Sequence, residues 1–234
     1  MSVMARARLR GRPKGARLLL AMLVGAGSVT GCQAGEPVSV RGTEIISWPV
    51  EDGATAGQVV VTIRNESDRA VDPDVFGRGS QTVAHLLDGD GAELPGAEAR
   101  IQLNAVPEVL GPGETGYLYG DFEIRDVPGS VADARIELNA DDAEEPTEVL
   151  VEDFELTEDG SGLGAVGRLE WDGSGSAVAR AIALDADGTP LGYVTTSEVR
   201  YDVGDFTMCC FPPPVEADLV VDVAVFGAQA TAEE

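Results

Sequence analysis

The stretch Val59-Val60-Val61-Thr62-Ile63-Arg64 decides the class of fold. Its first, third and fifth residues are branched and apolar, and its fourth and sixth residues are polar. Successive side chains of a β-strand point to opposite faces of a sheet, so this alternation predicts a strand with one face in a core. The polar residues Asn65-Glu66-Ser67-Asp68 follow directly and are typical of a turn.

The same alternation recurs further along the chain, in residues 134–139 and 219–226. Between such stretches lie segments rich in glycine and proline that favour turns, for example Gly111-Pro112-Gly113 and Asp172-Gly173-Ser174-Gly175. After residue 32, no window has the i, i+3, i+4, i+7 apolar spacing of an amphipathic helix. We therefore expect an all-β protein. The residues expected to face inward are Ala134, Ile136 and Leu138 in one stretch and Leu219, Val221, Val223 and Val225 in the other.

A weak internal repeat predicts two domains with a similar order of elements. Leu87-Asp88-Gly89-Asp90-Gly91 is matched by Leu184-Asp185-Ala186-Asp187-Gly188, and strands are expected before and after each copy. A polar, proline-ended segment between the halves is typical of a linker. We therefore predict two tandem antiparallel β-sandwich domains. The expected boundaries are a tether at 32–42, domains at 43–140 and 147–227, an acidic linker at 141–146 and an acidic tail at 228–234.

This order of elements resembles the FxLYD-type immunoglobulin-like domains of prokaryotic lipoproteins. The shared order is a strand, an asparagine-containing turn, a strand ending in Leu-Asp-x-Asp-Gly, a further strand and a Leu-x-Pro-Gly-Glu turn, here at residues 110–114. The second half lacks the Pro-Gly-Glu turn, and Leu87 and Leu184 occupy the place of the family's tyrosine. The resemblance implies immunoglobulin-like sandwiches without enzyme activity, and it identifies no functional residues.

The first 32 residues have the three zones of a secretory signal. A basic head and an apolar run at 18–24 lead through small residues to Cys32. The run is shorter than the roughly 20 residues that a membrane-spanning helix needs. Val29-Thr30-Gly31-Cys32 resembles the lipobox of prokaryotic lipoproteins, in which a diacylglyceryl group is attached to the cysteine and a peptidase cuts before it. The resemblance implies a signal peptide at 1–31 and an extracytoplasmic protein anchored to a prokaryotic membrane through Cys32. The alternative is an ordinary signal peptide.

The composition is strongly acidic. The chain has 41 acidic residues against 16 basic ones, and the predicted leader holds six of the basic residues. The formal charge is −25 for the whole chain and 10 − 41 = −31 without the leader, which also removes the single lysine. Nucleic acids and anionic lipid surfaces require basic patches, so neither is expected as a partner. The acidity predicts a solvated surface, with capture of cations or of a basic partner as the alternative.

Asp88, Asp90, Asp185 and Asp187 are candidate calcium ligands. Aspartates two positions apart can place two oxygens on one cation. An EF-hand loop also requires a glutamate at its twelfth position, where both copies have an uncharged residue. Asp-Gly is also the strongest short signal for a hairpin turn, so we favour the turn over the calcium site.

Cys209 and Cys210 are adjacent, and lipidation of Cys32 would leave them as the two remaining cysteines in an oxidising compartment. Three interpretations stay open: two buried thiols on opposite faces of a strand, a vicinal disulfide, or an intermolecular bond. A metal site at this pair would need further ligands. Pro212-Pro213-Pro214 follows and predicts a stiff, extended segment.

Signals for catalysis are weak. His85 is the single histidine and is expected within a strand, half-covered by its neighbours. Gly162, Gly164 and Gly167 have the spacing of a dinucleotide-binding fingerprint, but a glycine- and serine-rich turn follows where that motif needs a helix. No serine-hydrolase elbow is present, and no pair of carboxylates stands out for glycoside hydrolysis. We expect no catalytic residues and no cofactor.

These observations favour a lipid-anchored, non-catalytic module that binds an unknown ligand or protein partner, or scaffolds the cell envelope. A calcium-binding accessory lipoprotein is the first alternative, and thermal stabilisation by calcium would distinguish it. A hydrolase with an unrecognised carboxylate site is the second, and a concave cleft with paired buried acids would favour it.

Overall fold

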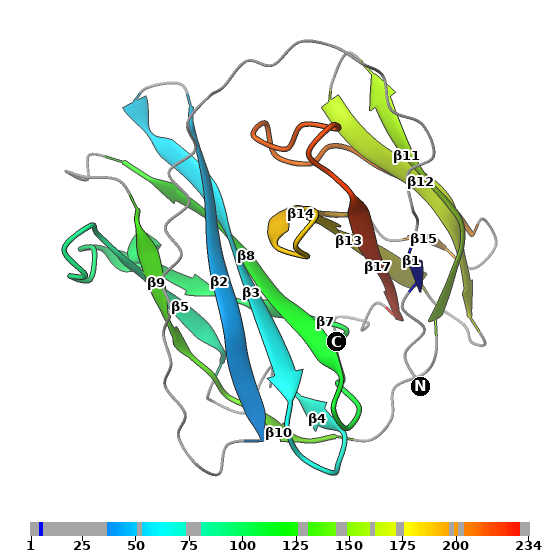
Figure 1. Ribbon diagram of the computed structural model, residues 1–234, viewed down its shortest axis with the longest axis horizontal. Coiled ribbons are helices and arrows are strands. Elements are labelled where there is room, and N and C mark those ends of the chain that lie inside the picture. Colours follow the sequence, from blue (N-terminus) through cyan, green and yellow to red (C-terminus); the bar gives the residue numbers. More distant parts are fainter. Residues whose placement is uncertain are drawn as a thin grey trace.

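The computed structural model describes residues 5–6, 37–50, 53–73, 81–125, 131–143, 149–159, 162–171, 176–196, 199–200 and 204–229. These residues form antiparallel sheets, with a short 3-10 turn, η2 (Ala97–Ala99), and no α-helix (Figure 1). The predicted all-β class is confirmed. None of the described segments is a helix with the length and apolar character needed to span a membrane.

Two facing sheets enclose the core of the N-terminal half. One has the strand order β2-β3-β8-β7 and the other has the order β6-β5-β9. The predicted inward residues Val59, Val61 and Ile63 are fully buried between them, in one cluster with Leu86 and Leu118. The strands of this half are β2 (Val38–Pro49), β3 (Thr55–Asn65), β4 (Val71–Asp72), β5 (Val83–Leu87), β6 (Arg100–Gln102), β7 (Asn104–Val106), β8 (Thr115–Ile124), β9 (Asp133–Glu137) and β10 (Asp141–Asp142).

The C-terminal half repeats this arrangement. Its sheets have the orders β11-β12-β16 and β17-β13-β14, and Leu169, Trp171, Phe206 and Val225 are buried between them. β15 pairs with β13, and the short strand β1 pairs with β17. The strands of this half are β11 (Val149–Asp159), β12 (Gly162–Trp171), β13 (Ser176–Leu184), β14 (Pro190–Thr195), β15 (Val199–Arg200), β16 (Asp205–Met208) and β17 (Asp222–Gln229), and β1 is Ala5–Arg6.

The two halves share one topology. Strands β2-β3-β8 of the first half correspond to β11-β12-β16 of the second, and β6-β5-β9 correspond to β14-β13-β17. The repeated Leu-Asp-x-Asp-Gly motif follows β5 in one half and β13 in the other, which are corresponding strands. The weak sequence repeat therefore reflects a repeated order of strands.

The halves stack through a shared apolar layer, which we call the inter-half interface. It lies between the outer face of sheet β2-β3-β8-β7 and the outer face of sheet β17-β13-β14, so that the sheets form successive layers (Figure 1). Val60 and Ile182 are fully buried there, and the rings of Tyr119 and Tyr193 lie 4.4 Å apart between their centroids. Its buried members are Val60, Val106, Tyr117, Tyr119, Ile182, Leu184, Tyr193, Ala224 and Phe226.

This interface corrects the expectation that β3 has one face in a core. Val60 is as fully buried as its neighbours Val59 and Val61, because the outer face of sheet β2-β3-β8-β7 packs against the C-terminal half and is shielded from water. A continuous apolar run is the usual pattern of a strand that is buried on both faces. The same holds for β17, where Val225 faces one core and Phe226 faces the interface.

The predicted strand at 219–226 begins later than expected. Leu219 and Val221 are 40% and 49% exposed and precede β17, which starts at Asp222. The Leu219 amide donates to the Glu216 carbonyl at 3.0 Å and closes a turn there. The alternation in this stretch therefore corresponds to a buried strand only from Val223 onward.

Segments near the predicted boundaries take part in the sheets. β2 starts at Val38, within the predicted tether, and β1 lies within the predicted leader. Asp141 and Asp142, from the predicted linker, form β10 and pair with β4. Asp142 Oδ2 also forms an ion pair with Arg69 Nη1 at 2.8 Å. The rest of the predicted linker, residues 144–146, lies outside the described residues.

Asn65 joins two turns of the N-terminal half. Its side-chain amide is fully buried and donates to the carbonyls of Arg69 at 2.7 Å, Leu110 at 3.0 Å and Gly111 at 3.1 Å. Its Oδ1 accepts the backbone amide of Ser67 at 2.9 Å. The asparagine turn and the Leu-Gly-Pro-Gly-Glu turn of the sequence are therefore held together by one side chain.

Candidate ligand-binding cleft

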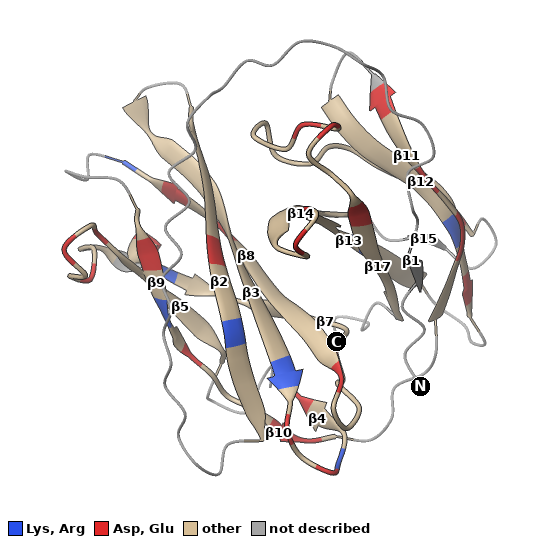
Figure 2. Cartoon of the chain, in the orientation of Figure 1, with Lys and Arg blue, Asp and Glu red and all other residues tan. Residues whose placement is uncertain are grey.

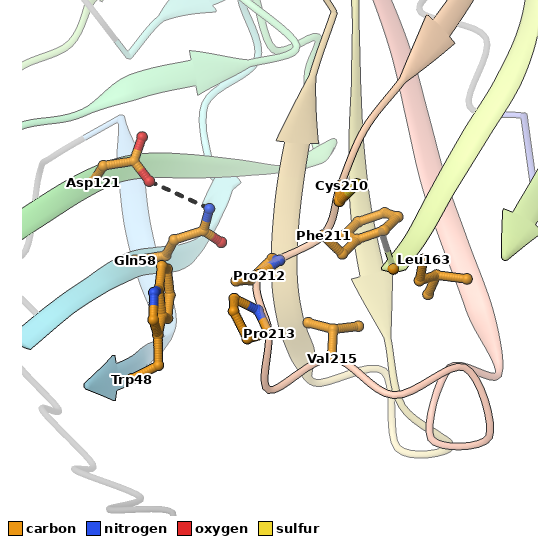
Figure 3. Close-up of a pocket in the computed structure, with 10 residues that line it drawn as sticks. Trp48, Gln58, Asp121, Leu163, Cys210, Phe211, Pro212, Pro213 and Val215 are labelled. Atoms are coloured by element: carbon orange, nitrogen blue, oxygen red, sulfur yellow. Dashed lines mark hydrogen bonds between the residues drawn. The ribbon is translucent and has the colours of Figure 1, made fainter. Parts of the chain in front are cut away.

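A cleft of about 590 Å³ opens between the two halves (Figure 3). This volume lies within the range of small-molecule sites in proteins. One wall comes from β2, β3 and β8, and the other comes from the start of β12 and the segment that follows β16. The lining residues are Trp48, Gln58, Asp121, Gly162, Leu163, Cys210, Phe211, Pro212, Pro213 and Val215.

The N-terminal wall presents three side chains from one face of its sheet. Gln58 on β3 lies opposite Asp121 on β8 in the strand register, and its Nε2 is 3.3 Å from the Asp121 Oδ1. Trp48 is half-buried near the end of β2, two residues beyond Ile46, which pairs with Gln58. Alternation along a strand places Ile46 and Trp48 on the same face, so aromatic, amide and carboxylate groups share this wall.

Hydrogen bonds from Gln58 to the opposite half hold the two walls together. Its Oε1 accepts the Tyr193 backbone amide at 2.9 Å, and its Nε2 donates to the Tyr193 carbonyl at 3.2 Å. The Tyr193 hydroxyl is hydrogen-bonded to Asp121. Burial, followed by this contact with Asp121, raises the pKa of Tyr193, so the hydroxyl remains a donor. Gln58 and Asp121 are therefore both oriented by Tyr193 of the other half.

An ion pair adds to this contact between the halves. Arg180 Nη1 on β13 lies 3.2 Å from Glu108 Oε1, and the guanidinium carbon lies 6.0 Å from the centroid of the Tyr119 ring. Arg180 is the more buried partner, with 18% of its side chain exposed. The cleft therefore lies beside an interface with both apolar and charged contacts.

The C-terminal wall is built around Cys209 and Cys210, which are joined by a disulfide across a cis peptide bond. Cys209 is exposed and Cys210 is partly buried. The Phe211 amide then donates to the Leu163 carbonyl at 2.8 Å and attaches this segment to β12. The wall thus consists of a disulfide and a proline-rich segment tied to a sheet.

Gly192 on β14 allows this wall to lie close to the sheet. Its φ is +155°, and a Cβ at this position would lie 2.8 Å from Pro212 Cγ and 2.9 Å from Val215 Cγ2. A side chain would push Pro212 outward and change the width of the cleft. The proline-rich segment itself turns here, because the Val215 amide donates to the Pro212 carbonyl at 2.9 Å.

The aspartate motifs form two matching hairpin turns. Asp88 Oδ1 accepts the amides of Asp90 at 2.9 Å and Ala92 at 2.8 Å. In the second copy, Asp185 Oδ1 accepts the amides of Asp187 at 2.8 Å and Thr189 at 2.9 Å. The glycine that ends each motif has a positive φ, 78° at Gly91 and 81° at Gly188. The first aspartate of each motif therefore closes its turn, and none of the four aspartates lines the cleft.

His85 has a carboxylate on each side of its ring. Nδ1 lies 2.9 Å from Glu93 Oε1 and Nε2 lies 3.4 Å from Glu137 Oε2, while Arg135 binds the other oxygen of Glu93 at 2.9 Å. The hydrogen bond from His85 comes first among the causes that lower the pKa of Glu93. With 12% of its side chain exposed, His85 is a covered strand histidine, and the cleft lies elsewhere.

The three glycines with fingerprint spacing lie within β12, and the chain continues there as a strand. A Cβ at Gly164 would lie 2.5 Å from the Met208 carbonyl oxygen, and one at Gly167 would lie 2.7 Å from Phe206 Cζ. Both glycines are therefore needed for the close approach of β16. The helix that a dinucleotide-binding motif requires is not formed here.

Other predicted features fall outside this site. Cys32 lies outside the described residues. Within the described ranges, no group of three or more histidine, cysteine, aspartate or glutamate side chains could hold a metal ion. Acidic residues are spread over strands and turns rather than gathered on one face (Figure 2).

No sequence pattern marked Trp48, Gln58, Asp121 or Tyr193, because residues from separate strands and from both halves meet here. A local signal existed for part of the site, because the adjacent cysteines and the prolines after them stand out in the sequence, and Cys210, Pro212 and Pro213 line the cleft. No family model matches the chain, and neither a curated protein nor a solved structure matches it.

Proposed function

We propose that this chain is an exported lipoprotein, anchored through Cys32, that binds a ligand without catalysis in the cleft between two immunoglobulin-like halves. The observation that carries the proposal is the cleft itself. Its walls come from different halves, and the side-chain amide of Gln58 makes two hydrogen bonds to the Tyr193 backbone across them. A cleft with pre-positioned walls loses less conformational entropy on binding than one that must assemble around its ligand.

The strand order supports the immunoglobulin-like assignment. In constant-type immunoglobulin domains, strands A, B, E and D form one sheet and C, F and G form the other. In the first half, β2, β3, β8 and β7 follow the order A, B, E, D, and β5 and β9 take the places of C and F in the second sheet, where β6 is added beside β5 and no described strand takes the place of G. The second half has β11, β12 and β16 opposite β13 and β17, which is the same order without strand D.

The lipobox-like residues 29–32 and the basic head support the anchor. The first strand of the body, β2, starts at Val38, so residues 33–37 connect it to Cys32. Five residues extend at most about 3.6 Å each, so the body would lie within about 18 Å of the lipid attachment. Such a short connection suits a binding module that acts at the membrane surface.

The groups in the cleft support binding rather than acid–base chemistry. Among the residues that line it, Asp121 is the single carboxylate, whereas glycosidases that use carboxylates place a pair across the substrate. The carboxylate accepts hydrogen bonds from Gln58 and Tyr193, which orient it as a fixed acceptor. Aromatic, proline and aliphatic side chains supply the remaining contact surface.

The binding proposal is tested by thermal shift with a chemically diverse ligand library on the full chain, purified in a non-ionic detergent. At least one ligand class should raise Tm, and Trp48→Ala should abolish that increase without lowering the Tm of the free protein by more than a few degrees. The proposal is wrong if no ligand stabilises the protein, or if every stabilising ligand acts equally on the Trp48→Ala variant.

The anchor is tested separately by detergent phase partitioning and intact mass. The protein extracted from membranes should begin at Cys32 and carry the mass of a diacylglyceryl group, and Cys32→Ala should move it to the aqueous phase. A Cys32→Ala protein that stays in the detergent phase would place the anchor elsewhere and leave the binding proposal intact.

A further inference from the structure

We infer that the cleft binds an organic cation, an alkylammonium or quaternary ammonium group with an apolar body. The inference rests on the proposed ligand-binding function and names its ligand class. It starts from Asp121 and Trp48, which both line one wall, and from the apolar surface opposite them.

Asp121 gives the cleft a negative charge with room for a further donor. A carboxylate has about four acceptor sites, and Gln58 and Tyr193 each donate to it. Both donors are neutral, so the charge of Asp121 has no cationic partner among the cleft residues. The whole chain carries a formal charge of −25, which raises the local concentration of cations and lowers that of anions.

Trp48 provides the second element of cation recognition. A cation over the face of an aromatic ring is attracted by the ring quadrupole, and tryptophan is the strongest of the three aromatic residues in this respect. Figure 3 shows the Trp48 indole on the side of Gln58, across from Pro213 and Val215. Trp48 and Asp121 line the same wall with the Gln58 side chain between them, so a ligand that lies along this wall meets both an aromatic face and a carboxylate (Figure 3).

The opposite wall suits the apolar body of such a ligand. Leu163, Phe211 and Val215 are more than 90% buried and present their remaining surface to the cleft. Pro212 and Pro213 add rigid apolar surface and no backbone N–H donor. Alkyl or methyl groups around a cationic centre would be desolvated against this wall, which favours them over a strongly hydrated metal ion.

Other ligand classes fit these groups less well. An anion would face Asp121 and the negative field of the protein. A neutral sugar needs several donors and acceptors, but the Gln58 amide already uses both of its ends on Tyr193. A divalent cation needs more than one carboxylate, since calcium takes six to eight oxygen ligands.

This ligand chemistry can come from two sources, a free small organic cation or a lysine side chain of another protein. The test uses isothermal titration calorimetry of the full chain in non-ionic detergent with two cationic probes. The probes are choline and a short peptide containing one lysine with both termini blocked. The neutral isostere of choline, 3,3-dimethylbutan-1-ol, is the matched control for charge.

We expect at least one cationic probe to saturate the protein, and the neutral isostere to bind at least about tenfold more weakly than choline. Asp121→Asn should weaken the cationic probe by about tenfold, because the amide still accepts from Tyr193 while its charge is lost. Trp48→Leu should weaken it to a similar extent. Asp90→Asn removes the same charge from an exposed turn away from the cleft and should leave binding within twofold.

Preference for choline identifies a free small organic cation as the source, and preference for the lysine peptide identifies a protein side chain. The inference is overturned if neither probe saturates at about 50 mM, if the neutral isostere binds as well as choline, or if Asp121→Asn binds as tightly as Asp90→Asn. Each of these outcomes leaves the proposed function standing if the library contains a different, Trp48-dependent ligand. If the library contains none, the proposed function fails as well.

Discussion

Ile182→Ala should destabilise the whole protein, because Ile182 lies in the C-terminal half but packs against the N-terminal half. Its side chain is fully buried in the inter-half interface. The change removes three carbon atoms, about 0.8 kcal/mol each in transfer free energy, and leaves a cavity. We expect a loss of about 3–4 kcal/mol in the free energy of unfolding. If the halves did not pack together, Ile182 would be exposed and the cost would be within about 0.5 kcal/mol.

The two tryptophans allow the halves to be followed separately, because Trp48 lies in the first half and Trp171 in the second. In Trp48→Phe the remaining tryptophan reports on the second half, and in Trp171→Phe it reports on the first half, so fluorescence during urea unfolding follows one half at a time. Both should show one transition at the same midpoint, and Ile182→Ala should lower both midpoints together. Leu219→Ala, at a residue that is 40% exposed, is the control and should change neither.

Two outcomes would refute the claim that the halves unfold as one cooperative unit. One is two well-separated transitions, and the other is an Ile182→Ala midpoint equal to that of Leu219→Ala. The first outcome would mean that each half unfolds alone. The second would mean that the interface contributes little to stability.

Three further predictions concern stability. Asn65→Ala should lower the free energy of unfolding by about 3 kcal/mol, measured by urea denaturation, because the carbonyls of Leu110 and Gly111 lose a buried donor; Ser67→Ala is the milder control. Burial first, and then the charge of Asp185 from the other half, raise the pKa of Glu44. Its protonated form therefore adds stability that is present below the unfolded pKa and is lost as pH rises through the folded pKa. Glu44→Gln should thus raise Tm at pH 7 and leave it unchanged near pH 3.5, and equal shifts at both pH values would contradict this. Sodium chloride should raise Tm by screening the repulsion among the acidic residues, and a Tm indifferent to salt would mean that they are locally compensated.

The two halves stack head to tail. The face β2-β3-β8 of one half packs on the face β14-β13-β17 of the next, which is a head-to-tail contact that could in principle continue. The exposed end of the first half carries His85, Arg135 and Glu137 on β5 and β9 instead of apolar side chains. In repeat proteins, polar outer faces of this kind keep an array soluble.

The all-β class followed from the sequence because alternation in 59–64 and the turn residues after it are local signals. The repeated aspartate turns were equally local, and both copies form the same hydrogen bonds. The burial of Val60 was less evident, although the unbroken run of three valines is the pattern of a strand covered on both faces.

The cleft could not be predicted in the same way. Trp48, Asp121 and Cys210 lie on different elements from both halves, and they meet only because the halves stack. Sequence alone showed two similar halves and could not show which faces of them meet. The paired cysteines were ambiguous for another reason, since burial and geometry decide between thiols and a bridge.

The measurement that tests the central claim most directly is hydrogen exchange at the Tyr193 amide in the full chain. This amide donates to the Gln58 side chain of the other half, so its protection reports the locked cleft. We predict that it exchanges as slowly as core amides of β13, and that Gln58→Ala accelerates it while β13 stays protected. Fast exchange at Tyr193 in the unmodified chain, beside a protected β13, would show that the two walls are not held together.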